Sequence, residues 1–247
     1  MRVLVAIPAF NEAETITSVV SAVVGAGYDC VVIDDGSVDA TGARARAAGA
    51  TVLPLSVNLG VGGGLRCAFR YAVYHGYSRV VQCDADGQHP VDQIERLVAA
   101  AERGPHALVI GSRFAEGGSS FPVRGLRRWA MLTLASRVTR AAGKPFTDTS
   151  SGFRCISEPL LGQFARDYPR HYLADTFEAL LIAARAGYPI DEVAVDMKAR
   201  QGGVASASSL KSTGYLARAL LSGMMGLHHD IDSYATVTAA NAARSSS

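Results

Sequence analysis

The 247-residue sequence lacks the features that mark membrane-spanning, disulfide-rich and nucleic-acid-binding proteins. No uncharged apolar stretch is long enough to cross a bilayer, and the run after Met1 is too short for the core of a signal peptide. Four cysteines without a C-x-x-C pair favour buried thiols in the reducing cytoplasm over a disulfide framework or a zinc site. Because 24 Lys and Arg nearly balance 22 Asp and Glu, the net charge of +2 indicates no nucleic acid partner.

What is present is an alternation of short apolar runs with helical periodicity. The apolar runs are residues 3–7, 30–33, 51–55, 80–83 and 107–110. Apolar residues at helical spacing follow in 16–23, 65–73 and 94–101, and Asn11 is the expected N-cap of the first helix. This order predicts an α/β fold with a mostly parallel central sheet flanked by helices, in a single domain over residues 1–227.

The second half of the sequence is less regular. Helices are expected at 126–138, 177–184 and 210–227, the first of them rich in arginine around Trp129. Val193, Val195 and Met197 alternate with more polar residues, which predicts a half-exposed strand. Residues 228–247 are expected to form a C-terminal tail with a frayed end.

The most informative motif is D-A-D-G-Q-H-P at residues 84–90, directly after an apolar run. In a strand that frays into a loop, Asp84, Asp86 and Gln88 lie on the same side of the chain. Their oxygens suit Mg²⁺ or Mn²⁺, which keeps its other positions for water or for the phosphates of a nucleotide diphosphate. The alternative is an acidic turn with an Asp at a helix N-cap, because an amphipathic stretch opens at Pro90.

Ligands of open parallel sheets bind beyond the carboxyl ends of the strands, and polar motifs follow the predicted strands. They read P-A-F-N-E at 8–12, D-D-G-S at 34–37, D-A-D-G-Q-H-P at 84–90, G-S-R-F at 111–114 and, further on, D-T-S-S-G-F-R at 148–154. In this order they resemble family 2 glycosyltransferases of the GT-A fold, particularly the branch with dolichyl-phosphate mannose synthases and bacterial polyprenyl-phosphate glycosyltransferases. The resemblance extends over residues 2–211 and implies a metal-dependent glycosyltransferase.

The resemblance implies that a nucleotide diphosphate sugar, linked to UDP or GDP, binds at the first motifs. Glu12 and Asp35 would accept hydrogen bonds from the base or the ribose, and Pro8, Phe10 and Ile33 would wall the base. For Glu12 and Asp35, helix capping and turn formation are the alternative roles.

The D-x-D motif and one arginine complete the implied donor site. Asp86 and Gln88 would hold the metal ion, which stabilises the charge that develops on the leaving diphosphate. Asp84 and Ala85 would lie beside the diphosphate and the sugar, and Arg200 would offer a guanidinium fork to phosphate oxygens.

The implied acceptor is polyprenyl phosphate, whose oxygen is already ionised near neutral pH and needs no general base, whereas a hydroxyl acceptor needs one. The family's segments that meet the lipid phosphate correspond to Arg113, Arg127, Arg128, Ser208 and Ser209. We predict Asp84, Asp86 and Arg113 as the catalytic residues. The segment 148–154 holds either a further catalytic Asp or a buried structural Asp–Arg pair.

The helices at 126–138 and 210–227 are the expected sites of association. Either they rest on the inner face of the cell membrane, as a peripheral contact of a cytoplasmic protein, or they pack in the core or between subunits. A homo-oligomer or a small membrane partner is therefore compatible with the sequence.

Other functional classes compete with this interpretation. A glycosyltransferase that acts on a soluble hydroxyl acceptor, such as a metabolite or a growing glycan, is favoured by the absence of a spanning helix. A nucleotide-binding scaffold without chemistry is disfavoured by the intact metal motif and Arg113, and a sugar-1-phosphate nucleotidyltransferase by P-A-F-N-E in place of a Gly-rich loop carrying Arg. The Gly-rich segment 58–64 is expected to be a loop. It does not bind NAD, since Leu65 occupies the last glycine position of G-x-G-x-x-G, and its Val61 stands where many family members carry Lys.

Overall fold

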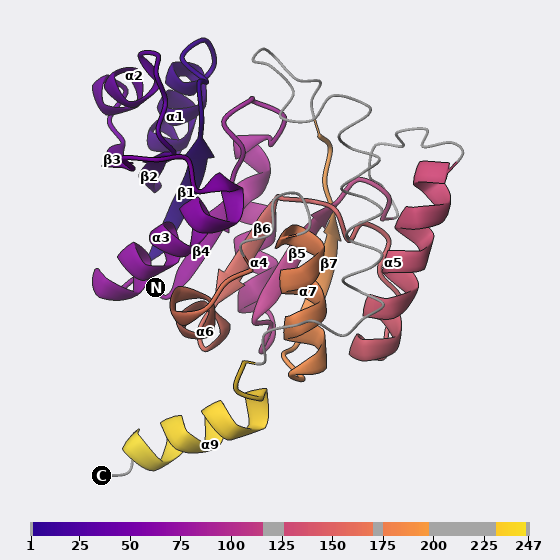
Figure 1. The fold of residues 1–247 in the computed structure, drawn as a ribbon. Coiled ribbons are helices and arrows are strands. Elements are labelled where there is room, and N and C mark those ends of the chain that lie inside the picture. The colour runs from indigo at the N-terminus through magenta and orange to yellow at the C-terminus, as the bar shows by residue number, and fades with distance from the viewer. Residues whose placement is uncertain (1, 116–125, 170–174, 198–230, 246–247) are drawn as a thin grey trace.

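The computed structural model describes residues 2–115, 126–169, 175–197 and 231–245, which form one sheet with helices on both faces (Figure 1). The strands are β1 (Val3–Ala9), β2 (Asp29–Asp34), β3 (Thr51–Pro54), β4 (Arg79–Gln82), β5 (Leu108–Ser112), β6 (Arg154–Ser157) and β7 (Ile190–Ala194). The helices are α1 (Ile16–Gly25), α2 (Thr41–Ala47), α3 (Gly60–Tyr74), η1 (Val91–Gln93), α4 (Ile94–Glu102), α5 (Leu126–Ala142), α6 (Leu160–Arg166), α7 (Asp175–Arg185) and α9 (Tyr234–Ser245).

The strand order of the sheet is β3-β2-β1-β4-β6-β5-β7. β1 pairs in parallel with β2 and β4, β2 with β3, and β5 with β7. Only β6 runs antiparallel to its neighbours β4 and β5 within this sheet, so all its other strands end at the same edge. The predicted single α/β domain with a mostly parallel sheet is confirmed.

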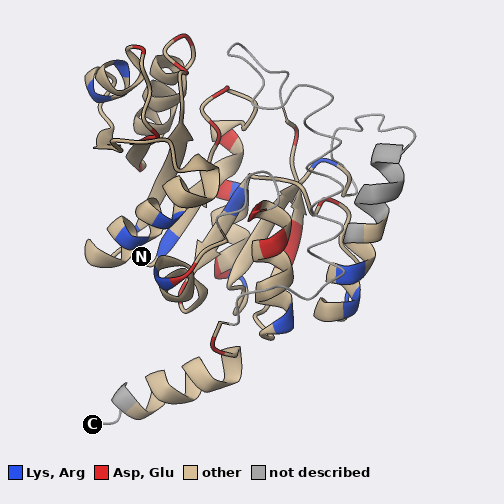
Figure 2. Ribbon diagram, in the orientation of Figure 1, with Lys and Arg blue, Asp and Glu red and all other residues tan. Residues whose placement is uncertain are grey.

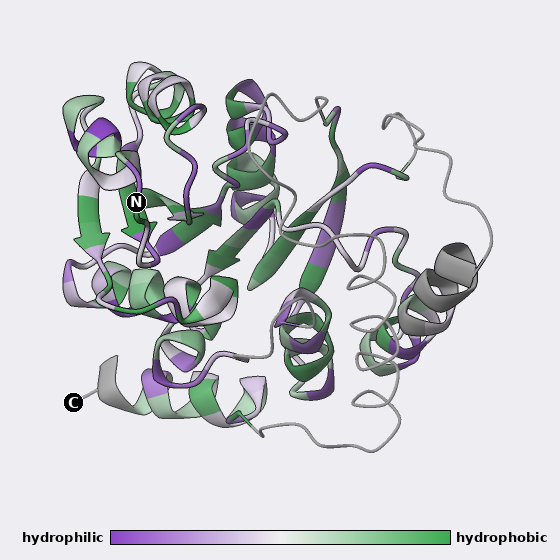
Figure 3. Cartoon of the chain, turned by 45° about the horizontal axis from the view of Figure 1, so that its top comes forward, coloured by the Kyte–Doolittle hydropathy of each residue, from purple (hydrophilic) through white to green (hydrophobic). Residues whose placement is uncertain are grey.

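Helices on both faces explain why the strands are almost continuously apolar. Leu4 and Ala6 of β1 pack in a core with α3, α6 and α7, whereas Val5 and Ile7 pack in a second core with α1 and α4. Figure 3 shows the hydrophobic strands enclosed between the two layers of helices. Helices cover both faces of the sheet, so a ligand can reach it at the polar ends of the strands.

The predicted elements of the first half form, with two corrections. All five apolar runs are strands, β1 to β5, and the helical stretches are α1, α3 and α4. Asn11 is not an N-cap, because α1 begins at Ile16; Asn11 has a left-handed φ of 55°, and its Oδ1 accepts a hydrogen bond from the amide of Val38 at 2.9 Å. The Gly-rich segment is not simply a loop, since Gly60 already begins α3.

In the second half, α5 and α7 form where helices are expected, but other elements differ. Sequence analysis misses α2, β6 and α6, which are only 7, 4 and 7 residues long. β7 ends at Ala194, before most of the predicted alternation. The helix expected at 210–227 lies outside the described residues.

Helix α9 occupies most of the segment that is expected to be a tail. The amide of Tyr234 donates to the carbonyl oxygen of Ala186 at 2.9 Å, and its ring meets that of Tyr188 with the centroids 5.5 Å apart. Beyond this anchor the helix extends away from the sheet (Figure 1).

In the described part of the chain, positive and negative residues are interspersed and no surface carries charge of one sign alone (Figure 2). Lys and Arg are spread over α2, α3, α5 and α7, with Asp and Glu between them (Figure 2). None of the described helices combines the length and the apolar composition that a bilayer crossing requires. All four cysteines are free thiols, and Cys30, Cys83 and Cys155 are buried.

Candidate active site

The sheet topology brings the polar motifs to a common edge. Ala9 at the end of β1 lies opposite Asp34 of β2, and the amide of Cys83 donates to the carbonyl oxygen of Ala6 at 3.0 Å. Because β6 is antiparallel, it starts at this edge, and its first residue, Arg154, pairs with Gln82 at the end of β4. The segment that precedes β6 is therefore next to the D-x-D motif.

The D-x-D segment turns instead of continuing as a strand. β4 ends at Gln82, and Gly87 has a φ of 76°, a conformation that strains any residue with a side chain. The amide of Gln88 donates to Oδ1 of Asp86 at 3.0 Å and closes the turn. The predicted strand-like alternation is wrong here. Of the alternative, the turn is present but the Asp N-cap is not, because η1 begins after Pro90 without a side-chain cap.

His89 holds Asp84 at two points. Its Nδ1 accepts a hydrogen bond from the amide of Asp84 at 2.9 Å, and its Nε2 lies 3.5 Å from Oδ2 of the same residue. Because Nδ1 accepts, the neutral ring carries its hydrogen on Nε2, toward the carboxylate. The side chain is 3% exposed and stacks on Phe153 with the centroids 4.9 Å apart. His89 thus fixes both the backbone and the carboxylate of Asp84.

The donor atoms of this turn fit a hard divalent cation. Asp84 has a 40% exposed side chain, whereas Asp86 is only 7% exposed and is therefore a buried residue of the turn. Within the described ranges, no three His, Cys, Asp or Glu side chains are grouped as a complete metal site. An incomplete set of carboxylate and amide oxygens suits Mg²⁺ or Mn²⁺ that takes its other ligands from water and a diphosphate. Asp86 and Gln88 stay the predicted protein ligands.

Gly152 allows the segment before β6 to lie against Asp84. A Cβ atom here would lie 3.1 Å from Nε2 of Gln82 and 3.4 Å from Oδ1 of Asp84. We expect Gly152→Val to lower the transfer rate by up to about 100-fold, since its methyl groups must displace the carboxylate. Steady-state rates and melting curves check this, with Gly25→Val, whose Cβ would enter open space, as the control. Wild-type turnover in Gly152→Val would contradict it.

On the nucleotide side of the edge, Asp35 caps α3. Its Oδ1 accepts the amide of Leu59 at 2.7 Å and its Oδ2 the amide of Gly60 at 2.8 Å. Burial raises the pKa of Asp35, although these two hydrogen bonds lower it. The capping role is therefore present in the structure, and contact with a base or ribose stays a prediction that must use the remaining lone pairs of the carboxylate.

The other predicted nucleotide contacts differ in access. Phe10 is 46% exposed at the end of β1, and Pro8 is partly buried. Ile33 is fully buried in the core, and a Cβ atom built on Gly64 would lie 3.5 Å from its Cγ2; its contact with a base stays a prediction. The amide of Glu12 donates to Oγ1 of Thr41 at 2.8 Å, and its carboxylate accepts from Oγ1 of Thr15 at 3.2 Å, so Glu12 also supports the start of α1.

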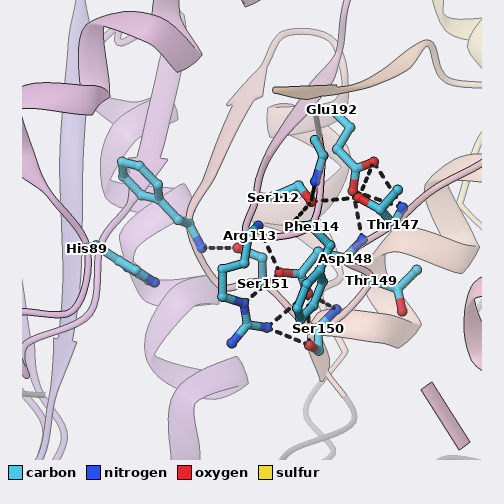
Figure 4. A network of polar contacts seen from close by, with 12 residues as sticks. His89, Ser112, Arg113, Phe114, Thr147, Asp148, Thr149, Ser150, Ser151 and Glu192 are labelled. Atoms are coloured by element: carbon cyan, nitrogen blue, oxygen red, sulfur yellow. Dashed lines mark hydrogen bonds and ion pairs between the residues drawn. The ribbon is translucent and has the colours of Figure 1, made fainter. Parts of the chain in front are cut away.

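Arg113 at the end of β5 forms a two-pronged ion pair with Asp148. Nε lies 2.7 Å from Oδ2, and Nη2 lies 2.9 Å from Oδ1 and 3.0 Å from Oγ of Ser150 (Figure 4). Burial raises the pKa of the fully buried Asp148, but the hydrogen bonds and charge of Arg113 outweigh it and hold that pKa below its ordinary value. Among the described residues, Nη1 of Arg113 donates to no protein atom. Of the guanidinium nitrogens, Nη1 is therefore the one that the described residues leave for a ligand.

Asp148 therefore pairs with Arg113 and not with Arg154. The buried guanidinium of Arg154 donates to the carbonyl oxygens of Ser151, Thr176 and Thr149 at 2.7, 2.6 and 3.3 Å, which ties this segment to the start of α7.

Sequence reasoning missed the carboxylates Asp175 and Glu192. Burial raises the pKa of Asp175, at the start of α7, to about 6, against the lowering effects of the Thr176 amide and the charge of Arg154. Its Oδ2 has no hydrogen-bond partner in the described part of the chain. Glu192 of β7 binds the segment that carries Asp148 (Figure 4).

Several predicted residues cannot be placed in this site. Arg200, Ser208 and Ser209 lie outside the described residues. Arg127 and Arg128 belong to α5, at positions where the structure describes the backbone only. Their proposed contacts with phosphate stay predictions.

A sheet of this order, with a D-x-D turn at its carboxyl edge, defines a GT-A glycosyltransferase fold. The same fold is found in glucosyl-3-phosphoglycerate synthase from Mycobacterium tuberculosis, crystallised with Mg²⁺ and uridine diphosphate. The TM-score is 0.70 at 22% sequence identity, over 91% of this chain and 78% of that one.

The family follows from sequence comparison. Residues 4–163 match glycosyl transferase family 2, and the chain belongs to this family. It is 37% identical over 164 residues to an undecaprenyl-phosphate mannosyltransferase of Micrococcus luteus, which covers 62% of this chain and 65% of that protein. It is 32% identical over 170 residues to a polyprenol monophosphomannose synthase of Mycolicibacterium smegmatis, which covers 65% of this chain and 63% of that protein. The chain therefore aligns with slightly less than two thirds of the length of these two relatives.

Proposed function

We propose that this family 2 glycosyltransferase moves a sugar from a nucleotide diphosphate sugar to polyprenyl phosphate, with inversion at the anomeric carbon. The observation that carries the proposal is its similarity to two proteins named for polyprenyl-phosphate acceptors, at 37% and 32% identity. Nη1 of Arg113, which no described residue binds, lies at the same edge of the sheet as the D-x-D turn and supports a second phosphate there.

The residues of this chain divide the reaction between them. Asp86 and Gln88 hold Mg²⁺ or Mn²⁺, which when bound offsets the charge of the leaving UDP or GDP. Asp84, fixed by His89, orients the donor sugar. Nη1 of Arg113 binds the acceptor phosphate. One phosphate oxygen forms the bond to the anomeric carbon as the bond to the diphosphate breaks, and this single displacement inverts the configuration without a general base.

The acceptor sets where this reaction takes place. A polyprenyl chain stays in the bilayer, so the protein meets its substrate at the inner face of the cell membrane as a peripheral, cytoplasmic enzyme. Four free thiols support a reducing compartment.

The decisive test follows a labelled sugar. The protein is incubated with a panel of UDP- and GDP-linked sugars and Mn²⁺, with and without polyprenyl phosphate in detergent. We expect label in the organic phase only when the lipid is supplied, attached through one phosphate with inverted configuration. The same reaction with polyprenol, which lacks the phosphate, is the control, and label that moves at comparable rates to water-soluble acceptors would contradict the proposal.

One observation favours the second candidate, transfer to a soluble hydroxyl. A hydroxyl acceptor needs a general base, and Asp175 is a buried carboxyl with a pKa of about 6, an oxygen without a partner in the described part of the chain, and an electrostatic influence from Asp84. Asp175→Asn tests this base directly, whichever acceptor takes the label. A hydroxyl transferase that uses this base loses its turnover, whereas transfer to a phosphate continues.

A further inference from the structure

Glu192 of β7 binds two consecutive residues of the segment that precedes β6. Its Oε1 and Oε2 lie 3.1 and 2.9 Å from the amide nitrogen of Thr147, and Oε1 lies 2.8 Å from the amide nitrogen of Asp148. Oε2 also accepts from Oγ1 of Thr147 at 2.9 Å. Glu192 pairs with Ile110 across the parallel strands, so Ser112, two residues further along β5, points to the same face.

A continuous hydrogen-bonded chain runs from Glu192 to the end of β5 (Figure 4). Thr147 gives its hydroxyl hydrogen to Glu192, so in its contact with Ser112, at 2.7 Å, Oγ of Ser112 must be the donor. Oγ of Ser112 in turn accepts the amides of Phe114 and Ala115, both at 3.1 Å. All these hydrogen bonds therefore donate toward Glu192, because its carboxylate can only accept.

The same segment delivers the carboxylate that holds Arg113. Asp148 is fully buried, so the position of its carboxylate follows that of its backbone. Glu192 holds that backbone, because it accepts a hydrogen bond from the amide of Asp148. Asp148 then fixes the plane of the guanidinium with two hydrogen bonds. Three elements, β7, the segment before β6 and the end of β5, thus meet in one network.

We propose that Glu192 is a positioning residue, which orients Arg113 for a phosphate ligand through the backbone of Thr147 and Asp148. That Arg113 meets a phosphate rests on the proposed function, whereas the effect of Glu192 on Arg113 does not. In the described part of the chain, the carboxylate accepts every hydrogen bond that it makes to this segment, from the amides of Thr147 and Asp148 and from the hydroxyl of Thr147. Glutamine has the same shape, but its NH₂ group cannot accept, so the two amides must share one oxygen and the hydroxyl of Thr147 must turn from donor to acceptor.

The first test needs no substrate. NMR of protein labelled with ¹⁵N-arginine measures hydrogen exchange of the Arg113 Nε–H, assigned by its loss in Arg113→Lys. We expect exchange to be slower than in the exposed Arg166 by roughly tenfold or more, since a charged acceptor holds this hydrogen, and Glu192→Gln to remove most of that protection. Protection that is unchanged in Glu192→Gln would overturn the proposal, whichever acceptor the enzyme uses.

The matched control is Asp191→Asn on the same strand. Asp191 is ion-paired with Lys144 at 2.8 Å, and its carboxylate accepts from the backbone amide of Glu192, but no described hydrogen bond joins it to Thr147 or Asp148. Its replacement should leave the exchange of Arg113 unchanged. If it accelerates exchange as much as Glu192→Gln does, the effect reflects a loosened strand and the proposal fails.

The second test measures transfer with the acceptor that the labelled-sugar experiment identifies. In the otherwise wild-type protein, Glu192→Gln should lower the transfer rate at limiting acceptor by up to about 100-fold. Added to Arg113→Lys, it should lower the rate by less than about twofold, because the two residues act as a unit. Additive losses would mean that Glu192 acts independently of Arg113.

Thr147→Val replaces this test if Glu192→Gln does not fold. It removes only the hydroxyl link between Glu192 and Ser112 and should accelerate hydrogen exchange of Arg113 to an intermediate degree. Exchange at the wild-type rate in Thr147→Val would overturn the proposal.

Discussion

Replacing Asp86 with Asn is expected to lower sugar transfer by roughly 10²- to 10³-fold, the size of effect seen when one charge-stabilising group of an active site is removed. Asn keeps an oxygen that can accept the amide of Gln88, so the turn stays closed. What is lost is the negative charge that holds the metal ion against the diphosphate. Because Asp86 is buried, Asn is a cleaner substitution than Ala, which would leave that amide without its acceptor.

The experiment is a Mn²⁺ titration of the transfer rate, with thermal melting of both proteins. The variant should need more metal, or fail to saturate, and melt within a few degrees of the wild type. Asp92→Asn is the matched control, since Asp92 is an exposed carboxylate of the following η1. An Asp86→Asn protein that transfers sugar at full rate in EDTA would rule out a metal bound at this turn.

Strand ends were the part of the site that the sequence could predict. Apolar runs flanked by helical periodicity locate β1 to β5, and in a parallel sheet their polar ends must share an edge, which places Asp84, Asp86 and Arg113 at one edge of the sheet. The same reasoning failed for the shape of the D-x-D segment. A period of two describes a strand, but Gly87 and the contact between Gln88 and Asp86 make a turn.

Pairing partners were not predictable in the same way. Arg113 and Asp148 are 35 residues apart, and only the antiparallel insertion of β6 brings them together. β6 is four residues long and starts with the buried charge of Arg154, so it does not look like an apolar run. For Glu192 the sequence does indicate the face of the strand. It directly precedes Val193, which alternates with Val195, so its side chain lies on the opposite face from theirs. The sequence does not reveal that this face meets the segment before β6.

Removing Arg113 should destabilise the protein as well as stop transfer. Arg113→Ala leaves the carboxylate of Asp148 fully buried, with the hydroxyl and amide of Ser150 and the backbone amide at position 113 but without its counter-charge. Breaking one side of such a pair costs about 3 kcal/mol, the low end of the usual range because the Arg113 side chain is 24% exposed. For a chain of this size, the melting temperature should fall by roughly 6 to 12 °C. Arg113→Lys keeps the charge and should lose less stability, but its turnover should fall because the planar fork is gone.

The pH dependence distinguishes this cause from general loss of packing. With Arg113 present, the folded-state pKa of Asp148 is lowered, so its stabilising effect is complete above the ordinary unfolded value of about 3.9 and is lost as the pH falls below it. Without Arg113, burial dominates and raises the pKa of Asp148. The variant is then destabilised at pH values above this raised pKa, where folding must bury the charged carboxylate, and not at lower pH, where Asp148 is neutral. The difference in melting temperature should therefore be largest near pH 7 and shrink toward pH 4. Arg166→Ala, which breaks an exposed pair with Asp232, should cost at most about 1 kcal/mol with little change over this range. A gap between Arg113→Ala and the wild type that does not change between pH 7 and pH 4 would mean that lost contacts, and not an uncompensated Asp148, destabilise the variant.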